Sequence, residues 1–246
     1  YEISACLVGS EMCIRDRLSV AAPDHVNTVI LDEIYRGIKD QCMRYQLNIL
    51  GGDTVRTEGP MVWTVTIIGE VPKGTAVMRS GAKVGDVVGV TNYVGYAATG
   101  LGALSYNLVG YDMTKVGHQR PEPQIELGQK LRRLGIHSMN DISDGLGSEL
   151  NEIAVASNVS IVFEEQAIPL HEETYALAKH LQTNPVDYAL YGGEDFQLVF
   201  TAPKSLLSEL EKLAGITLIG EVLSGPPRVQ MVTLCLLYTS DAADEE

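Results

Sequence analysis

Two carboxylates and a hydroxyl group lie close together in the segment DISDG, residues 141–145. Residues i and i+2 of an extended chain share a face, so Asp141 and Ser143 would point the same way. Asp144 would then be the N-cap of a helix that begins directly after it, where backbone N–H groups point outward. Such oxygens and N–H donors suit Mg²⁺ and phosphate. The alternative is a simple helix cap with Glu149 nearby, which explains Asp144 but leaves Asp141 without a role.

Two further segments combine paired glycines with acids. The GGDT segment, residues 51–54, closes a short apolar stretch, and Asp53 would stand at the end of that strand as a hard oxygen donor. The GGED segment, residues 192–195, lies between two apolar stretches, and Glu194 and Asp195 would project in different directions. Both segments also have an explanation without function, the first as an exit from strand to turn and the second as a polar hairpin loop.

Cations are placed together in the segment RSGAK, residues 79–83, where Arg79 and Lys83 flank a glycine. This arrangement suits phosphate contacts, and its alternative is a solvated charged turn. The chain has neither the GxSxG pattern of a serine hydrolase nor the HExxH pattern of a zinc protease. Its glycines also match neither a P-loop nor a Rossmann turn.

The elements that must position these segments alternate between helix and strand along the chain. Apolar residues recur at helical spacing over residues 30–45 and again after Asp144. This alternation predicts an α/β or α+β protein, with a boundary at the turn over residues 72–74. We predict further helices over residues 97–108, from Pro123 to 134, 172–181 and 204–213, and strands over residues 47–50, 62–68, 86–91, 160–163, 188–191, 196–201 and 217–222.

Composition excludes several classes of protein. The 246 residues include 18 Lys and Arg against 32 Asp and Glu, a net charge of −14, which argues against a nucleic-acid partner. No uncharged apolar run approaches the roughly 18 residues that span a bilayer, so we expect no membrane partner. The four cysteines show no CxxC spacing and no signal peptide is visible, so we expect a cytoplasmic protein with reduced thiols.

The two ends of the chain differ from its middle. Residues 1–17 show no sustained period, and residues 233–246 join a short apolar run to an acidic end. We expect both to be non-native tails from translated adapter sequence, with ordinary frayed termini as the alternative. This leaves residues 18–74 as a first part and residues 75–232 as a larger α/β domain.

The ordered set GGDT, RSGAKxGD, HxRPEP, DISDGL and GGEDFQL resembles the thiamine-monophosphate kinase family over about residues 18–230. That family belongs to the ATP-binding superfamily of aminoimidazole ribonucleotide synthetase and selenophosphate synthetase. The resemblance implies a two-part fold of that type, in which residues 18–74 are the remnant of an N-terminal ATP-binding domain with an incomplete sheet. It also implies transfer of the γ-phosphoryl group of ATP to thiamine phosphate, and a homodimer paired through the N-terminal sheets.

The resemblance assigns roles to residues one by one. Glu194 matches the glutamate placed at thiamine phosphate, and the Mg²⁺ ligands match Asp53, Asp141 and Asp144. The residues that match ATP contacts are Tyr35, Gly52, Asp53, Arg79 and Ser143. No side-chain nucleophile or general base is expected, because an ionised phosphate oxygen of the substrate attacks.

This chain also departs from the family pattern. The family's opening Gly-Asp-Asp segment, a further acidic segment and the Asn-Leu-Ser-Asp segment are absent, as is its closing segment after about Val229. We therefore expect a fragment that binds Mg²⁺–ATP weakly and turns over poorly. Two alternatives remain: another ATP-using enzyme of the superfamily, or a non-catalytic nucleotide-binding remnant. The GGED loop with HxRPEP favours the thiamine phosphate branch.

Overall fold

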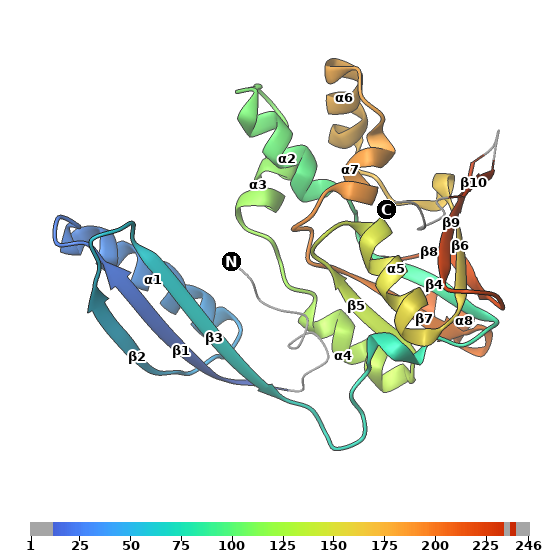
Figure 1. Cartoon of the computed structure of the whole chain (residues 1–246), viewed down its shortest axis with the longest axis horizontal. Coiled ribbons are helices and arrows are strands. Elements are labelled where there is room, and N and C mark those ends of the chain that lie inside the picture. Colours follow the sequence, from blue (N-terminus) through green and yellow to red (C-terminus); the bar gives the residue numbers. More distant parts are fainter. Residues whose placement is uncertain (1–11, 234–236, 240–246) are drawn as a thin grey trace, which may run out of the picture. The chain divides into compact units, whose positions relative to one another are not determined.

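The computed structural model describes residues 12–233 and 237–239, and it consists of two compact units that divide between Ala76 and Val77 (Figure 1). This division lies close to the expected boundary at residues 72–74. Among the described residues, no helix is both long enough and apolar enough to cross a membrane.

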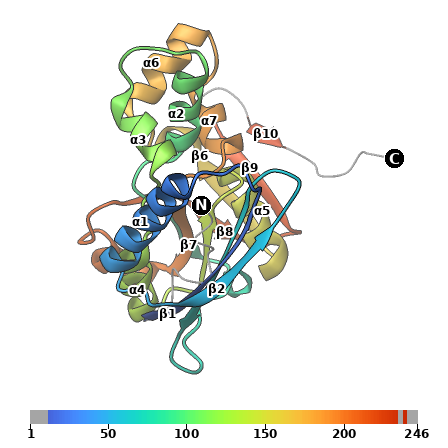
Figure 2. The same cartoon turned by 90° about the vertical axis from the view of Figure 1, so that its left-hand side faces the viewer.

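Within its described residues, unit 1 is a three-stranded sheet with one helix. Its elements in chain order are β1 (Met12–Ala22), α1 (Thr28–Arg44), β2 (Ile49–Arg56) and β3 (Val62–Glu70). The central strand β1 is parallel to β2 and antiparallel to β3. Helix α1 begins after Asn27, whose side chain accepts a hydrogen bond from the backbone of Val29, and it lies along one face of the sheet (Figure 2). The helix predicted over residues 30–45 is therefore confirmed.

Two expectations for unit 1 are wrong. Residues 12–17, which we placed in a tail outside the fold, form the first part of β1 and pair with both neighbouring strands, while residues 1–11 lie outside the described residues. The GGDT segment lies inside β2 and does not follow a strand that ends at Leu50. In both cases the extended conformation is stabilised by hydrogen bonds to a neighbouring strand. The local pattern of apolar residues does not indicate such pairing.

Unit 2 contains a sheet with the strand order β10-β9-β6-β8-β4-β7-β5 among the described residues. Neighbouring strands are antiparallel except for β6 and β9. The strands are β4 (Asp86–Thr91), β5 (Ser138–Ile142), β6 (Ser160–Glu164), β7 (Gln197–Pro203), β8 (Ile216–Leu223), β9 (Arg228–Val232) and β10 (Leu237–Thr239). The helical segments are η2 (Arg79–Gly81), α2 (Tyr96–Ser105), α3 (Asp112–Gln119), α4 (Ile125–Leu134), α5 (Leu146–Ser157), η3 (Glu165–Ala167), α6 (Glu172–Leu181), α7 (Pro185–Tyr191), η4 (Lys204–Leu206) and α8 (Leu207–Leu210).

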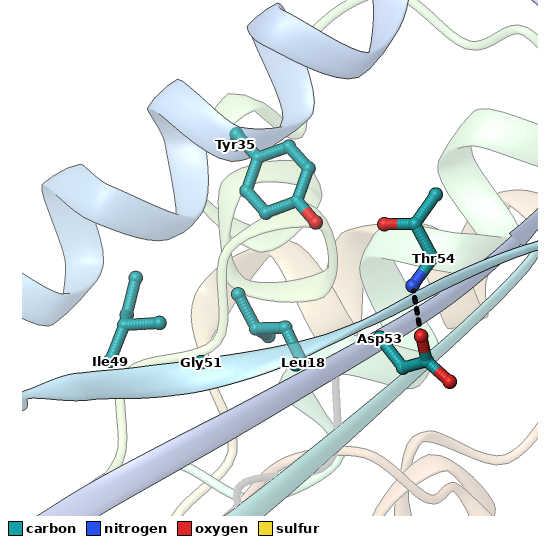
Figure 3. Close-up of a pocket in the computed structure, with 7 residues that line it drawn as sticks. Leu18, Tyr35, Ile49, Gly51, Asp53 and Thr54 are labelled. Carbon is teal, nitrogen blue, oxygen red and sulfur yellow. Dashed lines mark hydrogen bonds between the residues drawn. The ribbon is translucent and has the colours of Figure 1, made fainter.

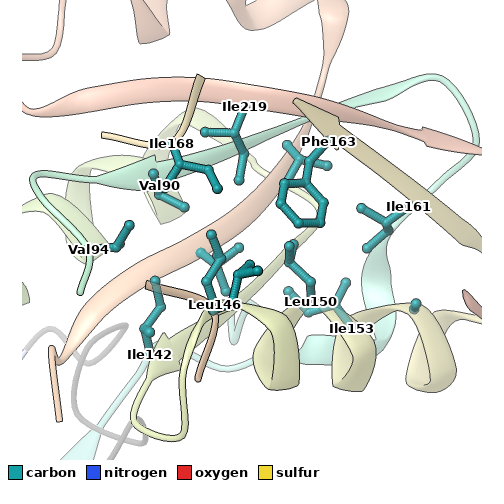
Figure 4. Close-up of a cluster of buried hydrophobic side chains, with 14 of the residues drawn as sticks. Val90, Val94, Ile142, Leu146, Leu150, Ile153, Ile161, Phe163, Ile168 and Ile219 are labelled. Carbon is teal, nitrogen blue, oxygen red and sulfur yellow. The ribbon is translucent and has the colours of Figure 1, made fainter. Parts of the chain in front are cut away.

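The core of unit 2 forms where α5 packs on the sheet (Figure 4). Leu146, Leu150 and Ile153 recur on one face of the helix and are fully buried. They contact a cluster that includes Ile161 and Phe163 of β6. The apolar face predicted for the helix after Asp144 is confirmed, and its burial holds the start of α5 against the end of β5.

The predicted strand over residues 188–191 is wrong, because these residues belong to α7. The side chain of Asn184 accepts a hydrogen bond from the backbone of Val186, and Pro185 occupies the first turn, which are both signals of a helix start. Helix α3 was not predicted. At the other end of the unit, β10 lies within the segment that we expected to be a tail and pairs with β9, while residues 234–236 and 240–246 lie outside the described residues. The mixed α/β class is confirmed.

We predict that Gly37→Ala stabilises unit 1. Gly37 lies inside α1 and is exposed, and apart from the adjoining backbone of the helix no atom lies within 4 Å of the Cβ that alanine would add. Alanine restricts the unfolded chain and favours helix, so the free energy of unfolding should rise by about 0.5–1 kcal/mol. Urea unfolding followed by the fluorescence of Trp63, the single tryptophan, measures this directly. An unchanged or lower free energy would contradict the described helix.

Candidate functional site

The DISDG segment joins β5 to α5 in unit 2. Asp141, at the end of β5, is 8% exposed, whereas Asp144 in the connecting turn is exposed. The N-cap of α5 is Gly145, with a φ of 95° and no capping side chain, so the expectation that Asp144 is the N-cap is wrong. Glycine makes the turn because a φ in this range is costly for other residues. The carboxylate of Asp144 is thereby left on the surface, where a ligand can reach it.

Glu149 supports this turn from behind. Its side chain is 3% exposed and accepts hydrogen bonds from the backbone N–H of Asp144 at 3.3 Å, from Ser143 Oγ at 3.4 Å and from Asn140 Nδ2. The capping alternative also placed Glu149 near Asp144. Neither that alternative nor these hydrogen bonds account for Asp141. The pKa of Glu149 is raised to about 7, mainly by burial and also by the charge of Glu152, against the lowering effect of the hydrogen bond from the backbone N–H of Asp144.

The segment concentrates negative charge. Burial raises the pKa of Asp141, and the nearby charges of Asp144 and Glu152 act in the same direction, whereas Arg79 lowers it. Carboxylate oxygens are the ligands that Mg²⁺ prefers, and a cation would relieve this repulsion, so the donors fit the metal. Among the described residues, no three His, Cys, Asp or Glu side chains form a complete metal group. A cation here would therefore take further ligands from water or phosphate.

Arg79 reaches the same cluster from η2. Its guanidinium forms an ion pair with Glu152, and Glu152 also accepts a hydrogen bond from Asn140 Nδ2 at 3.2 Å. The other cation of the RSGAK segment is Lys83, and its Nζ atom instead lies 3.2 Å from the Nε2 atom of His137. The two cations thus diverge, and only Arg79 stands where it can contact a phosphate bound near Asp141.

The GGED segment connects α7 to β7 and packs on the DISDG segment, so it is not the hairpin loop of the alternative explanation. Glu194 donates its backbone N–H to the carbonyl of Ser143 at 2.8 Å, and Phe196 donates to that of Ile142 at 2.9 Å. The two segments meet because β5 pairs with β7, with Ile142 opposite Gln197. The carboxylate of Glu194 is exposed, and its Oε2 atom lies 4.0 Å from His118 Nδ1.

Unit 2 therefore brings together five residues that the sequence singled out. They lie on three segments that are far apart in the chain, of which the GGED segment contacts the DISDG segment and Arg79 acts electrostatically on Asp141: Arg79, Asp141, Ser143, Asp144 and Glu194.

Unit 1 brings together the other three in a pocket of about 310 Å³ (Figure 3). Tyr35 of α1 lines it with Gly52 and Asp53 of β2, and Tyr35 also packs edge-on against Trp63 with ring centroids 5.2 Å apart. The carboxylate of Asp53 accepts a hydrogen bond from the backbone of Thr54 at 2.9 Å and points to the side of β2 away from Tyr35. Leu18, Ile49, Gly51 and Thr54 complete the lining.

Asp195 is the residue that sequence reasoning left without a role. It is 5% exposed, and its carboxylate accepts hydrogen bonds from the backbone N–H of Gly95 at 2.5 Å and of Ala97 at 2.8 Å. Its pKa is raised to about 7, because the effect of burial exceeds the lowering by hydrogen bonds from the backbone of Ala97, Gly95 and Tyr96. The sequence offers no signal for this contact, since the acceptor lies about a hundred residues from its donors.

We predict that this carboxyl group makes stability depend on pH. Between about pH 4 and about pH 7 the folded protein keeps a proton on Asp195 that the unfolded chain has lost, so the free energy of unfolding falls as the pH rises. Replacing Asp195 with asparagine removes this contribution, and the fall between about pH 5 and about pH 8 should shrink by about 2–3 kcal/mol. Urea unfolding at both pH values measures it. Glu149 contributes the same pH dependence to the wild type and to Asp195→Asn. An identical fall in the free energy of unfolding in these two proteins would therefore contradict the prediction.

Comparison with protein families gives two matches. Residues 83–232 match the C-terminal domain of AIR synthase related proteins, and residues 5–71 match the N-terminal domain of the same family.

Several known proteins with similar sequences and folds are thiamine-monophosphate kinases. The thiamine-monophosphate kinase of Bacillus subtilis (strain 168) is 40% identical over 190 residues, which cover 75% of this chain and 57% of that protein. The crystal structure of the thiamine-monophosphate kinase from Stenotrophomonas maltophilia K279a has a TM-score of 0.84 at 27% identity and covers 93% of this chain and 74% of that one. A structure of AaThiL complexed with AMPPCP and TMP has a TM-score of 0.81 at 28% identity, covering 93% and 72%. The chain spans less than two thirds of the curated relative's length.

Proposed function

The chain belongs to the AIR synthase related family, and from this membership we propose that the protein transfers the γ-phosphoryl group of ATP to thiamine phosphate, giving thiamine diphosphate and ADP. The observation that carries the proposal is the packing of the GGED segment on the DISDG segment, which places Glu194 beside the acids near Arg79. The motif order resembled that of thiamine-monophosphate kinases, and the similarity of this chain to such proteins supports the choice of substrate.

The reaction needs positioned charges more than a side-chain nucleophile. A phosphate oxygen of thiamine phosphate attacks the γ-phosphorus of ATP, a new P–O bond forms, and the bond to the β-phosphate oxygen breaks to release ADP. Arg79 contacts phosphate oxygens, and Ser143 contacts ATP. Asp141 and Asp144 would hold Mg²⁺, which supplies neutralisation of the phosphate charge. Glu194 is the contact to thiamine phosphate.

We assign the pocket of unit 1 to ATP as well. Tyr35 packs on the nucleotide and Gly52 lets its backbone approach, while Asp53, whose carboxylate points to the other side of β2 (Figure 3), is a further Mg²⁺ ligand on that side. The exposure of Asp53 and its bond to the Thr54 backbone leave carboxylate lone pairs available to a cation. We further propose, from the cysteine pattern, that the protein is cytoplasmic, where the buried thiol of Cys42 stays reduced.

Ligand-dependent thermal unfolding tests the choice of substrate. In the presence of Mg²⁺–ATP, thiamine phosphate should raise the melting temperature, because a ligand that binds only the native state stabilises it. Aminoimidazole ribonucleotide precursors and selenide serve as the competing substrates of the superfamily. Chromatography of the reaction should detect thiamine diphosphate and ADP in equal amounts. Stabilisation by one of the competitors instead would overturn the proposal in favour of another branch.

We also propose that the protein is a homodimer paired through the sheets of unit 1. Trp63 faces α1 through its contact with Tyr35, so Val62 and Ile68, at even spacing on β3, face away from the helix. These two residues are 52% and 55% exposed, and Val55 of β2 is 50% exposed. An apolar sheet face of this kind is a surface that another sheet can cover.

The double variant Val62→Lys, Ile68→Lys is expected to be monomeric. Burying two ammonium groups in an apolar interface costs several kcal/mol, which outweighs the contacts that remain. Sedimentation equilibrium measures the mass of each protein. Val109→Lys is the matched control, because Val109 in unit 2 is 97% exposed and should leave the mass unchanged. A monomeric wild-type chain, or a dimeric double variant, would refute the proposal.

A further inference from the structure

The start of α2 is capped by a residue from a different part of the chain. Its N-cap, Gly95, has no side chain to accept the first N–H groups of the helix. The carboxylate of Asp195 takes this role, accepting from Gly95, Tyr96 and Ala97. Because the side chain is almost fully buried, these backbone groups replace the water that would otherwise solvate it.

The residues on either side of Asp195 are held in unfavourable backbone conformations. Glu194 has a φ of 65° and Phe196 a φ of 49°, in the left-handed region that non-glycine residues seldom occupy. Such conformations persist only where the surroundings determine them strongly. Here the two backbone N–H groups donate to Ser143 and Ile142 on one side, while the Asp195 side chain binds the α2 terminus on the other.

We propose that Asp195 is a positioning residue that fixes the backbone of Glu194 for its contact with thiamine phosphate, by anchoring the GGED segment to the start of α2. The proposal rests on the proposed function. Asp195 does not touch the substrate: its carboxylate is buried against α2, while that of Glu194 is exposed beside His118. Without the anchor, the hydrogen bonds to Ser143 and Ile142 alone must hold two strained residues.

Amide hydrogen exchange tests the anchoring directly and needs no ligand. In Asp195→Asn, at about pH 8, exchange at the N–H groups of Glu194 and Phe196 should accelerate at least about tenfold. The amides of Val88 and Val90 in the central strand β4 should be unchanged. Unchanged exchange at Glu194 and Phe196, or equal acceleration at all four amides, would overturn the proposal. Asp195→Ser, which keeps one acceptor, gives the same comparison if the asparagine variant does not fold.

Ligand binding separates positioning from a purely structural role. The dissociation constant for thiamine phosphate, by titration calorimetry, should rise at least about tenfold in Asp195→Asn, while that for Mg²⁺–ATP stays within about twofold. Asp187→Asn is the matched control, since Asp187 is an exposed acid in the first turn of α7. Equal affinity for thiamine phosphate in wild type and variant would overturn the inference alone. No binding of thiamine phosphate by the wild type would instead contradict the proposed function, and the exchange rates would still decide the anchoring.

Discussion

Replacing Asp144 with asparagine is expected to weaken the Mg²⁺-dependent binding of ATP by about 10–100-fold, the effect of losing one charge-assisted contact of about 1.5–3 kcal/mol. Asp144 is exposed in the turn after β5, so the change leaves the core of unit 2 intact. The asparagine side chain has nearly the same shape as the aspartate carboxylate. The hydrogen bond from the backbone N–H of residue 144 to Glu149 also remains. The loss of ATP affinity therefore measures the contribution of the negative charge of Asp144.

Titration calorimetry with ATP, with and without Mg²⁺, measures this effect. The difference between wild type and Asp144→Asn should disappear when the metal is removed by chelation, because the carboxylate acts through the cation. Asp187→Asn should bind as the wild type does. If Asp144→Asn and Asp141→Asn both leave binding unchanged, the acidic cluster is structural, and the alternative of a non-catalytic remnant is favoured.

Replacing Gly193 with alanine is expected to separate the two segments that form the site. The added Cβ would lie 2.3 Å from the backbone oxygen of Ser143, which is closer than any such contact in real proteins. Because the Cβ is fixed to its backbone and the atom that it meets is a backbone oxygen, the segments must move apart, and the hydrogen bond from Glu194 to Ser143 is lost. We expect the free energy of unfolding of unit 2 to fall by about 2–3 kcal/mol, with loss of thiamine phosphate binding.

Urea unfolding followed by circular dichroism, together with calorimetry, tests this second prediction. Gly59→Ala is the control, since its Cβ would meet only the side chain of Thr57 at an ordinary 3.5 Å. Wild-type stability and binding in Gly193→Ala would mean that the close packing of the two segments does not matter for the site.

Local sequence determined the elements whose signals lie within a few residues. The strand over residues 86–91 and the helix over residues 172–181 have the predicted bounds, because β-branched runs and helical spacing need no distant partner. The candidate residues themselves also follow from sequence, since paired glycines and acids are short motifs and their order along the chain resembles one family. The two domain matches show that the chain belongs to the broader AIR synthase related family.

Only the tertiary structure decided which of these residues meet. Pairing of β5 with β7 brings Ser143 beside Glu194, and the same arrangement carries Asp195 to the start of α2. It also determined that residues 12–17 join a sheet and that the GGDT segment lies within a strand. Hydrogen bonds between strands and burial of a carboxylate join residues that are distant in the chain. The amino-acid sequence shows the type of each of these residues, but whether two of them are in contact depends on the folded backbone.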